Sequence, residues 1–410
     1  MKMKQIIAMA ALAAVTFSLN AQSINVDDAI QNYNRKSWKK AKVSIDAAAQ
    51  HEKTKDDAKV WYYRALIYTR IGDDISTNPK SKLKEFADIW ADEAYQSAIN
   101  YKRLDTEKNP EYSRNLVYVF DRIGYKYYEQ SRKFFNEKKY TEAMQLASRA
   151  AEMYNNSNQG DNAGEALYVA GLSAVGAHDT ANIKLYFNQL RRKRTDKDQV
   201  YNYLFNVYKA EGNVDQAMRV AADFKKNSKG NYKANILMAE GYLLGKNVEK
   251  IKEEINAALE LTKDSVDIYP VLLAQSAALL ELTEDYDEAE AKYKESLTLK
   301  PVQFEANFNM GKMFYNRAVD KLTAANDVPP DDETGLYDKL QEESKGLFRQ
   351  SIEYLVKAVD FLDNLPEAEK PYHRTNLASA LTALGTAYAR VEMYDESKAA
   401  HKRVQEMSAE

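Results

Sequence analysis

The sequence predicts an all-α fold in which antiparallel helix pairs stack into an elongated array, an α-solenoid. With 410 residues, the chain is longer than one compact core usually allows, so several domains or a repeat array are favoured. Its 14 Gly and 8 Pro are few for a fold with many turns, which favours helices over strands. Apolar residues recur at helical spacing and make up 45% of the chain, enough for a continuous core.

The N-terminus has the features of an export signal. A short cationic start precedes a nearly all-apolar segment from Ile6 to Leu19. As a helix this segment would be about 21 Å long, shorter than the roughly 30 Å hydrocarbon core of a bilayer. Ala21 supplies a small residue at a plausible cleavage point. We therefore predict a cleaved signal over residues 1–21 and a mature chain over 22–410, with an uncleaved anchor as the alternative.

The signal also predicts where the protein is found. It is short and Ala-rich, which is typical of bacteria. No later segment has about 18 consecutive apolar residues, so we expect a soluble mature chain that does not span a membrane. The expected location is the periplasm; secretion or a peripheral place at the outer membrane is the alternative.

The stretch from Asp198 to Phe224 shows a repeat unit most clearly. Two sets of apolar residues flank a turn at Gly212-Asn213. The sets are Tyr201, Leu204, Phe205 and Tyr208, then Ala217, Ala221 and Phe224. Within each set the residues are one, three or four positions apart, which places them on one face of a helix. The stretch is therefore predicted to be two amphipathic helices joined by a short turn.

The same pattern recurs along the chain and resembles the tetratricopeptide repeat (TPR). That family has a 34-residue unit with the pattern W-x2-L-G-x2-Y, then A-x3-F, then P. The best local matches are Leu381-x2-Leu384-Gly385-x2-Tyr388 and Ala289-x3-Tyr293 followed by Pro301. The units are degenerate, but they cover nearly all of residues 22–410. The resemblance implies a right-handed superhelix of TPR-like antiparallel helix pairs in an exported bacterial member of the family; two separate helical bundles remain the structural alternative.

The units can be aligned on the position of the second helix where the family has a small residue, which gives about nine units. The aligned positions are Ala41, Ala94, Ala143, Ile183, Ala217, Ile251, Ala289, Ile352 and Ser397. Steps longer than the 34-residue unit place insertions near 72–84 and 323–346. Small residues of the first helix, such as Gly171 and Gly385, are expected to face small residues of the second, so that the helix axes approach to about 8–10 Å.

The sequence contains no recognisable catalytic or metal-binding constellation. It has no Cys, which removes disulfides, thiolate ligands and Cys nucleophiles. Its four His are scattered, and the acidic loop from Asp327 to Glu333 lacks the spacing and central Gly of an EF-hand. A net charge of −3 gives no overall nucleic-acid signature, and the basic run from Arg191 to Arg194 fits a helix C-terminus. We predict a non-enzyme with no cofactor, no metal and no nucleic-acid partner.

The resemblance implies a partner-binding groove lined by the first helices. Transferring the groove positions of the family to this chain gives Tyr128, Arg132, Tyr168, Asn202, Asn206, Lys209, Lys233, Glu240, Phe308, Lys312 and Tyr315. Asn can bond a peptide backbone as donor and acceptor, and Tyr offers a large contact area at low entropic cost. Tyr128, Tyr168 and Tyr315 could equally fill the seams between helices.

These features favour a non-catalytic protein–protein interaction scaffold in the bacterial cell envelope, which binds partner peptides or helices in a concave groove. Two alternatives remain. An envelope carrier or accessory protein could use the aromatic groove for a glycan or another small ligand. An enzyme of unrecognised type would need a catalytic arrangement that these motifs do not contain.

Overall fold

The computed structural model describes residues 22–106, 109–329 and 334–409, which form helices, turns and short connections without any strand. The predicted signal, residues 1–21, lies outside the described residues. The chain divides into two compact units, the first ending at Thr195 and the second beginning at Asp196.

Among the described residues, unit 1 contains eight α-helices and one short 3-10 helix. They are α2 (Gln22–Asn34), α3 (Trp38–Gln50), α4 (Ala58–Thr77), η1 (Lys84–Phe86), α5 (Trp90–Leu104), α6 (Pro110–Asn136), α7 (Tyr140–Asn156), α8 (Gly160–Gly176) and α9 (Thr180–Arg192). Unit 2 contains α10 (Asp198–Ala210), α11 (Val214–Asn227), α12 (Tyr232–Leu244), α13 (Val248–Thr262), α14 (Ile268–Glu281), α15 (Tyr286–Leu299), α16 (Phe304–Asn326), α17 (Leu336–Asp363), η2 (Lys370–His373), α18 (Arg374–Arg390) and α19 (Tyr394–Ala409).

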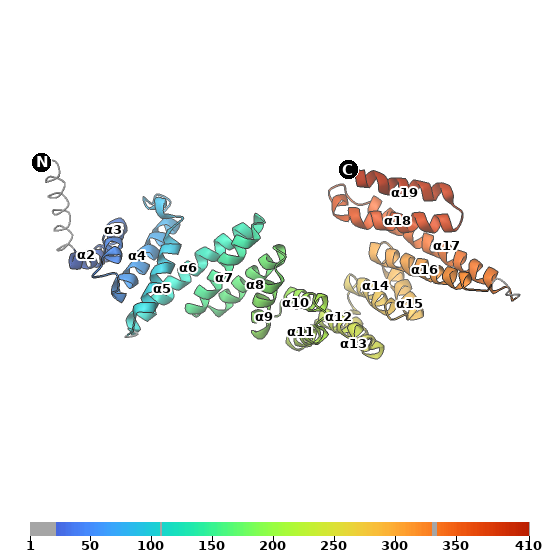
Figure 1. The fold of residues 1–410 in the computed structure, drawn as a ribbon, viewed down its shortest axis with the longest axis horizontal. Helices are drawn as coiled ribbons and strands as arrows, with labels where there is room; N and C mark the ends of the chain where they lie inside the picture. Colours follow the sequence, from blue (N-terminus) through green and yellow to red (C-terminus); the bar gives the residue numbers. More distant parts are fainter. Residues whose placement is uncertain (1–21, 107–108, 330–333, 410) are drawn as a thin grey trace, which may run out of the picture. The chain divides into compact units, whose positions relative to one another are not determined.

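Within each unit, every α-helix packs against the next one along the chain, which gives nine pairs from α2/α3 to α18/α19 (Figure 1). The first helix of a pair also contacts the first helix of the next pair, as α4 does with α6 and α12 with α14. Repetition of this contact is characteristic of a stacked array, in which each pair covers the apolar face of its neighbour. The described residues therefore confirm an all-α fold of about nine TPR-like helix pairs.

A residue with left-handed backbone conformation ends the first helix of most pairs. In α12/α13, Lys246 has φ 54°; its amide donates to the Leu243 carbonyl at 3.0 Å, and the Asn247 amide donates to the Tyr242 carbonyl at 3.1 Å. This pair of bonds is a Schellman motif, which satisfies carbonyls left open at a helix end. The equivalent residues are Lys36, Lys138, His178, Gly212, Glu284 and Glu392.

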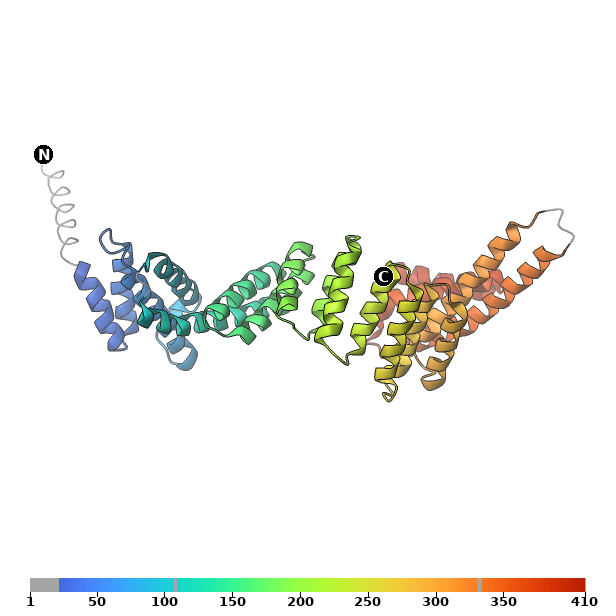
Figure 2. The same cartoon turned by 90° about the horizontal axis from the view of Figure 1, so that it is seen from below.

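The pairs α4/α5 and α16/α17 have longer connections, at the places where the sequence predicted insertions near 72–84 and 323–346. Part of each predicted insertion is helical, because α4 continues to Thr77, α16 reaches Asn326 and α17 begins at Leu336. The ends of α16 and α17 nearest their connecting loop extend past the helices packed beside them (Figure 2).

The small residues of the first helices face large side chains, which corrects the predicted contact between small residues. A methyl group on Gly171 would lie 2.0 Å from the ring of Phe187, and one on Gly385 would lie 3.0 Å from His401. Gly311 faces Leu355 in the same way. Each large side chain comes one helical turn after a buried residue of the second helix (Ile183, Ser351 or Ser397), so it fills the space above the glycine and gives close packing.

The aligned small positions of the second helices are buried in eight of the nine pairs, and the eighth pair needs a correction. The buried ones are Ala41, Ala94, Ala143, Ile183, Ala217, Ile251, Ala289 and Ser397. In α17 the predicted Ile352 is only half-buried. Its neighbour Ser351 is fully buried, and the Ser351 hydroxyl donates to the Gly311 carbonyl at 2.8 Å. The register of this pair is therefore one residue earlier than predicted.

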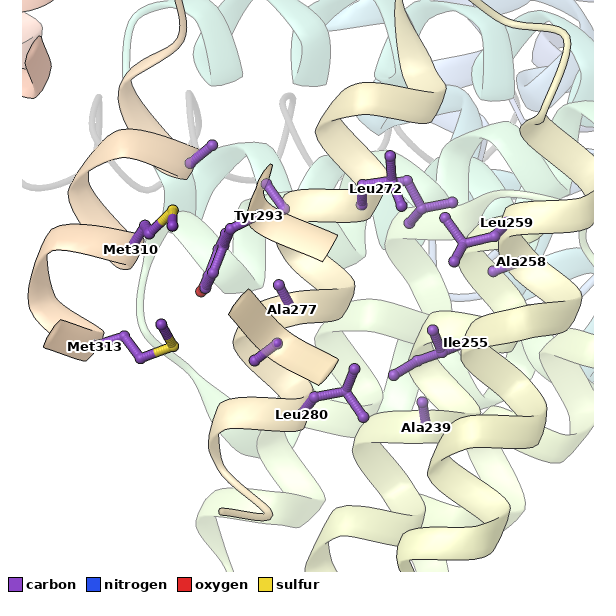
Figure 3. Packing of buried hydrophobic residues seen from close by; sticks show 14 of the residues in the cluster. Ala239, Ile255, Ala258, Leu259, Leu272, Ala277, Leu280, Tyr293, Met310 and Met313 are labelled. Atoms are coloured by element: carbon purple, nitrogen blue, oxygen red, sulfur yellow. The ribbon is translucent and has the colours of Figure 1, made fainter. Parts of the chain in front are cut away.

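The core of unit 2 shows how the pairs interlock (Figure 3). Tyr293 of α15 is fully buried and lies between Ala277 of α14 and the side chains of Met310 and Met313 of α16. The cluster continues without interruption to Ile255 of α13. One apolar core thus runs through several pairs of unit 2 and is not confined to a single pair.

Candidate partner-binding face

All eleven predicted groove residues lie on first helices, but they fall into two sets. Tyr128 and Arg132 lie on α6 and Tyr168 on α8, in unit 1. The residues of unit 2 lie on α10, α12 and α16: Asn202, Asn206, Lys209, Lys233, Glu240, Phe308, Lys312 and Tyr315. Each side chain is half-buried or exposed, so all eleven are accessible to some degree.

In unit 1 the predicted tyrosines also take part in helix packing. The ring of Tyr128 lies 6.5 Å from that of Tyr154, and the ring of Tyr168 lies 6.4 Å from that of Phe187. The exposed guanidinium of Arg132 lies 5.9 Å from the centre of the Tyr128 ring. Tyr128 and Tyr168 therefore fill seams and still present part of their surface on the first-helix face.

In unit 2 two predicted lysines pair with carboxylates of neighbouring first helices. Lys209 of α10 lies 4.0 Å from Glu240 of α12, and Lys233 lies 2.7 Å from Asp198. Burial raises the pKa of Glu240, and the nearby Lys209 opposes that rise. The bond to Asp198 raises the pKa of Lys233 and ties α12 to the start of α10, so Lys233 has a clear structural role.

The three predicted residues of α16 form a mixed aromatic and basic patch. Phe308 stacks on Phe304 with ring centres 5.1 Å apart, and Lys312 lies 5.6 Å from the Phe308 ring. The Tyr315 ring meets the edge of Phe348 at 5.4 Å. Phe308 and Tyr315 thus support the core, while Lys312 is the exposed member of the patch.

One hollow on a first-helix face was missed by the sequence reasoning. It lies in unit 1 among α2, α4 and α6 and has a volume of about 230 Å³. We call it the tyrosine cleft. Its lining residues are Tyr33, Asn34, Tyr62, Tyr63, Leu66, Arg70, Glu111, Asn115 and Tyr118.

Tyrosine rings form the walls of the cleft. Tyr63 meets the rings of Tyr62 and Tyr33 nearly at right angles, with centres 5.0 and 6.0 Å apart. Behind them, Tyr112 stacks on Tyr62 with centres 3.9 Å apart. Edge-to-face and stacked pairs of this kind hold rings in fixed orientations, so the walls are pre-arranged.

The ion pair between Arg70 and Asp73 lies at one side of the cleft. Arg70 lies 4.5 Å from the centre of the Tyr118 ring, donates to the Tyr118 hydroxyl at 2.9 Å and lies 3.3 Å from Asp73. Asp73 also accepts from Arg122 at 2.8 Å and from the Tyr118 hydroxyl. Because Asp73 is shared by two arginines, both cations have a partner within the protein.

The hydroxyl groups of Tyr62 and Tyr118 are protonated at neutral pH. Burial raises the pKa of Tyr62 to about 12, although a hydrogen bond from the Asn115 amide at 2.7 Å acts in the opposite direction. Burial and the bond to Asp73 raise the pKa of Tyr118 to about 12. Tyr118 donates its proton to Asp73, whereas the Tyr62 hydroxyl keeps a proton that it can donate to an uncharged polar group.

One sequence signal could have revealed the cleft. Tyr112, Asn115, Tyr118 and Arg122 follow one another at intervals of three or four residues, which places them on one face of α6. Their partners on α4 come about 50 residues earlier, across the predicted insertion, so a search at the 34-residue period does not connect the two helices.

Two further properties of the described residues concern metal binding and membrane crossing. No group of three or more His, Asp or Glu side chains there is placed to hold a metal ion. No helix in the same part of the chain is both long and apolar enough to cross a membrane.

Comparison with known proteins adds two remote structural likenesses. No family model matches the chain, and no curated protein matches it. Human IFIT1, solved as a dimer with PPP-AAAA, is 13% identical over 93% of this chain and 89% of its own, with a TM-score of 0.31. Yeast Tom70 is 12% identical over 95% of this chain and 90% of its own, with a TM-score of 0.33. With scores this low, the fold assignment rests on the helix pairs described above.

Proposed function

We propose that this protein is a non-catalytic scaffold that binds an extended segment of a partner protein on its first-helix faces. The observation that carries the proposal is the tyrosine cleft. It is built from three successive first helices, its rings are fixed by mutual packing, and its polar groups include donors and acceptors. A binding site on rigid elements loses little side-chain entropy when a ligand is held.

The chemistry of the face suits a protein segment. A peptide backbone offers one donor and one acceptor per residue, and exposed amides such as Asn34 and Asn206 can bond to both. Tyrosine is enriched at recognition surfaces because it combines large apolar area with a hydroxyl. The proposal includes export to the bacterial cell envelope, which is supported by the signal predicted over residues 1–21.

Site-specific cross-linking tests the proposal. A photoreactive residue replaces Asn34, which is exposed in the cleft, and in a matched protein it replaces Glu142, which is exposed on the second helix α7. After irradiation in a cell-envelope extract, mass spectrometry identifies the cross-linked peptides. We expect position 34 to cross-link to one recurrent segment of a partner protein. Position 142 should not cross-link to that segment. Equal labelling from both positions, or no cross-linked protein from position 34, would contradict the scaffold.

A glycan or another small polyhydroxylated ligand is the second candidate. The observation that favours it is the polar lining of the cleft, where hydroxyl, amide and guanidinium groups outnumber aliphatic side chains. Thermal-shift measurement against a panel of neutral oligosaccharides separates the two functions. A raised melting temperature with an oligosaccharide, without a recurrent cross-linked peptide, would favour this candidate.

A further inference from the structure

The tyrosine cleft adjoins a second hollow, and we call the two together the groove. The second hollow, of about 540 Å³, shares Tyr33, Asn34 and Arg70 with the cleft. The second hollow is also lined by Trp38, Asp74 and Thr77 among others. Along α4 the groove runs from Tyr62 to Thr77, which corresponds to about 22 Å at 1.5 Å per residue. A site of this shape fits a linear chain better than a compact molecule.

The charged groups at the centre of the groove are already paired, and two exposed charged residues, Lys36 and Glu111, line its two hollows. Arg70 and Arg122 share Asp73, and the Ser81 hydroxyl donates to Asp74. A charged ligand group would have to displace one of these partners and lose its own hydration, which is costly in a partly buried site. An uncharged segment meets no such penalty, so the paired charges at the centre of the groove favour a neutral ligand there.

Aromatic rings line both hollows. Tyr33 contacts Tyr63 on one side and Trp38 on the other, with ring centres 6.0 and 5.5 Å apart. Tyr33, Tyr63 and Trp38 are all half-buried, so each leaves part of its ring accessible. Stiff apolar rings in a ligand would pack against these surfaces without losing side-chain freedom.

Hydrogen-bond donors lie between the rings. The Tyr62 oxygen accepts from the Asn115 amide, which leaves the Tyr62 proton able to donate, and the guanidinium of Arg70 has five N–H groups to share among its partners. A polyproline II helix has no internal hydrogen bonds, so its carbonyls need such donors. Proline also lacks an N–H, so it brings no donor that must be satisfied in return.

We infer that the tyrosine cleft and its neighbouring hollow bind a proline-rich segment in the polyproline II conformation. The inference rests on the proposed scaffold function and names the class of segment that it takes. At about 3.1 Å per residue, a groove of about 22 Å holds about seven residues. Aromatic-lined grooves favour such segments because the ligand is already extended before it binds.

Three probes and three variants test the inference on the whole chain. The probes are an amidated, fluorescein-labelled nonaproline, a labelled proline-free peptide of equal length made of Ser, Lys and Glu, and cellohexaose. The variants are Tyr63→Ala, Tyr63→Phe and, as matched control, Tyr125→Ala, which removes a tyrosine of α6 that is 51% exposed outside the cleft. Fluorescence anisotropy measures the peptides, and titration calorimetry measures the sugar.

We expect nonaproline to bind and the proline-free peptide to bind at least about tenfold more weakly. Tyr63→Ala should weaken nonaproline binding by about tenfold, since it removes one aromatic wall. Tyr63→Phe should weaken it less because the ring remains, and Tyr125→Ala should leave it unchanged. Circular dichroism confirms that each variant is as helical as the parent.

Each contrary result has a separate meaning. Equal or tighter binding of the proline-free peptide would overturn the proline preference and leave the scaffold intact. Binding of cellohexaose alone, or of none of the three probes, would overturn both the proline preference and the proposed peptide site. Equal effects of Tyr63→Ala and Tyr125→Ala on nonaproline would show that the peptide binds elsewhere.

Discussion

At the scale of single residues, a few glycines determine how closely paired helices approach. Gly171 lies directly beneath the Phe187 ring, whereas Gly164 of the same helix has open space where a side chain would begin. The sequence pattern identified Gly171 as a packing position but not what faces it. Periodicity assigns a residue to a helix face, and the side chain that fills the opposite space depends on the relative rotation of two helices.

These two glycines give a matched pair of mutations. Gly171→Ala should lower the free energy of unfolding by about 1–3 kcal/mol, because the added methyl must displace a fully buried ring. Gly164→Ala should raise it by up to about 1 kcal/mol, because alanine is the better helix former and meets no neighbour. Urea unfolding followed by circular dichroism measures both. A Gly171→Ala protein as stable as the parent would contradict the close contact.

At the scale of elements, the Schellman turns repeat more regularly than the sequence motif. Six of the seven left-handed residues in these Schellman turns are not glycine, and they include Lys, His and Glu. A search for Gly-Asn or Gly-Asp turns therefore finds only part of them. The helices themselves could be predicted, since each has its own local period of apolar residues.

Gly212 and Gly245 test the turn geometry. Gly212 has φ 69°, so Gly212→Ala should lower stability by about 1 kcal/mol although its surroundings are open. Gly245 precedes the left-handed Lys246 and itself has φ −93°, so Gly245→Ala should be neutral or slightly stabilising. Thermal melts of the two variants measured side by side provide the comparison. Equal melting temperatures would show that backbone strain at Gly212 is unimportant.

The eighth pair and the tyrosine cleft show where sequence reasoning at this scale stops. Ser351 and Ile352 are adjacent, and the pattern favoured the apolar residue, but the buried serine can donate to a backbone carbonyl across the pair. The cleft draws its walls from three helices whose register is shifted by an insertion. Contacts that depend on such a shifted register can be identified only from the three-dimensional arrangement of the helices.

At the scale of the whole molecule, the buried tyrosines make the free energy of unfolding depend on pH in the alkaline range. The chain has 29 Tyr, and burial raises the pKa of many of them from 10.0, including Tyr62, Tyr118 and Tyr154, each to about 12. Below pH about 10 the folded and unfolded chains both keep these hydroxyls protonated, so their contribution to stability is fully present. Above it the unfolded chain ionises first, and stability is lost as pH rises to about 12.

We therefore expect the urea midpoint to be constant up to pH about 10 and to fall steadily from there to about 12. The ultraviolet absorbance of tyrosinate should rise later in the folded protein than in the chain unfolded in urea. Tyr118→Phe should make the fall less steep, because it removes one hydroxyl whose pKa is raised. Asp73 keeps Arg70 and Arg122 as partners in this variant. A urea midpoint that does not change up to pH about 12 would contradict the raised pKa values of the buried tyrosines.

The left-handed turns also offer places for chemical labels. Since the sequence has no Cys, two introduced thiols would be the only attachment points for a pair of maleimide dyes. Lys138 and His178 end the first helices of two successive pairs in unit 1, and neither lines the tyrosine cleft. Donor and acceptor dyes beside them would report, by energy transfer, whether the spacing between those pairs opens or closes when a ligand is added.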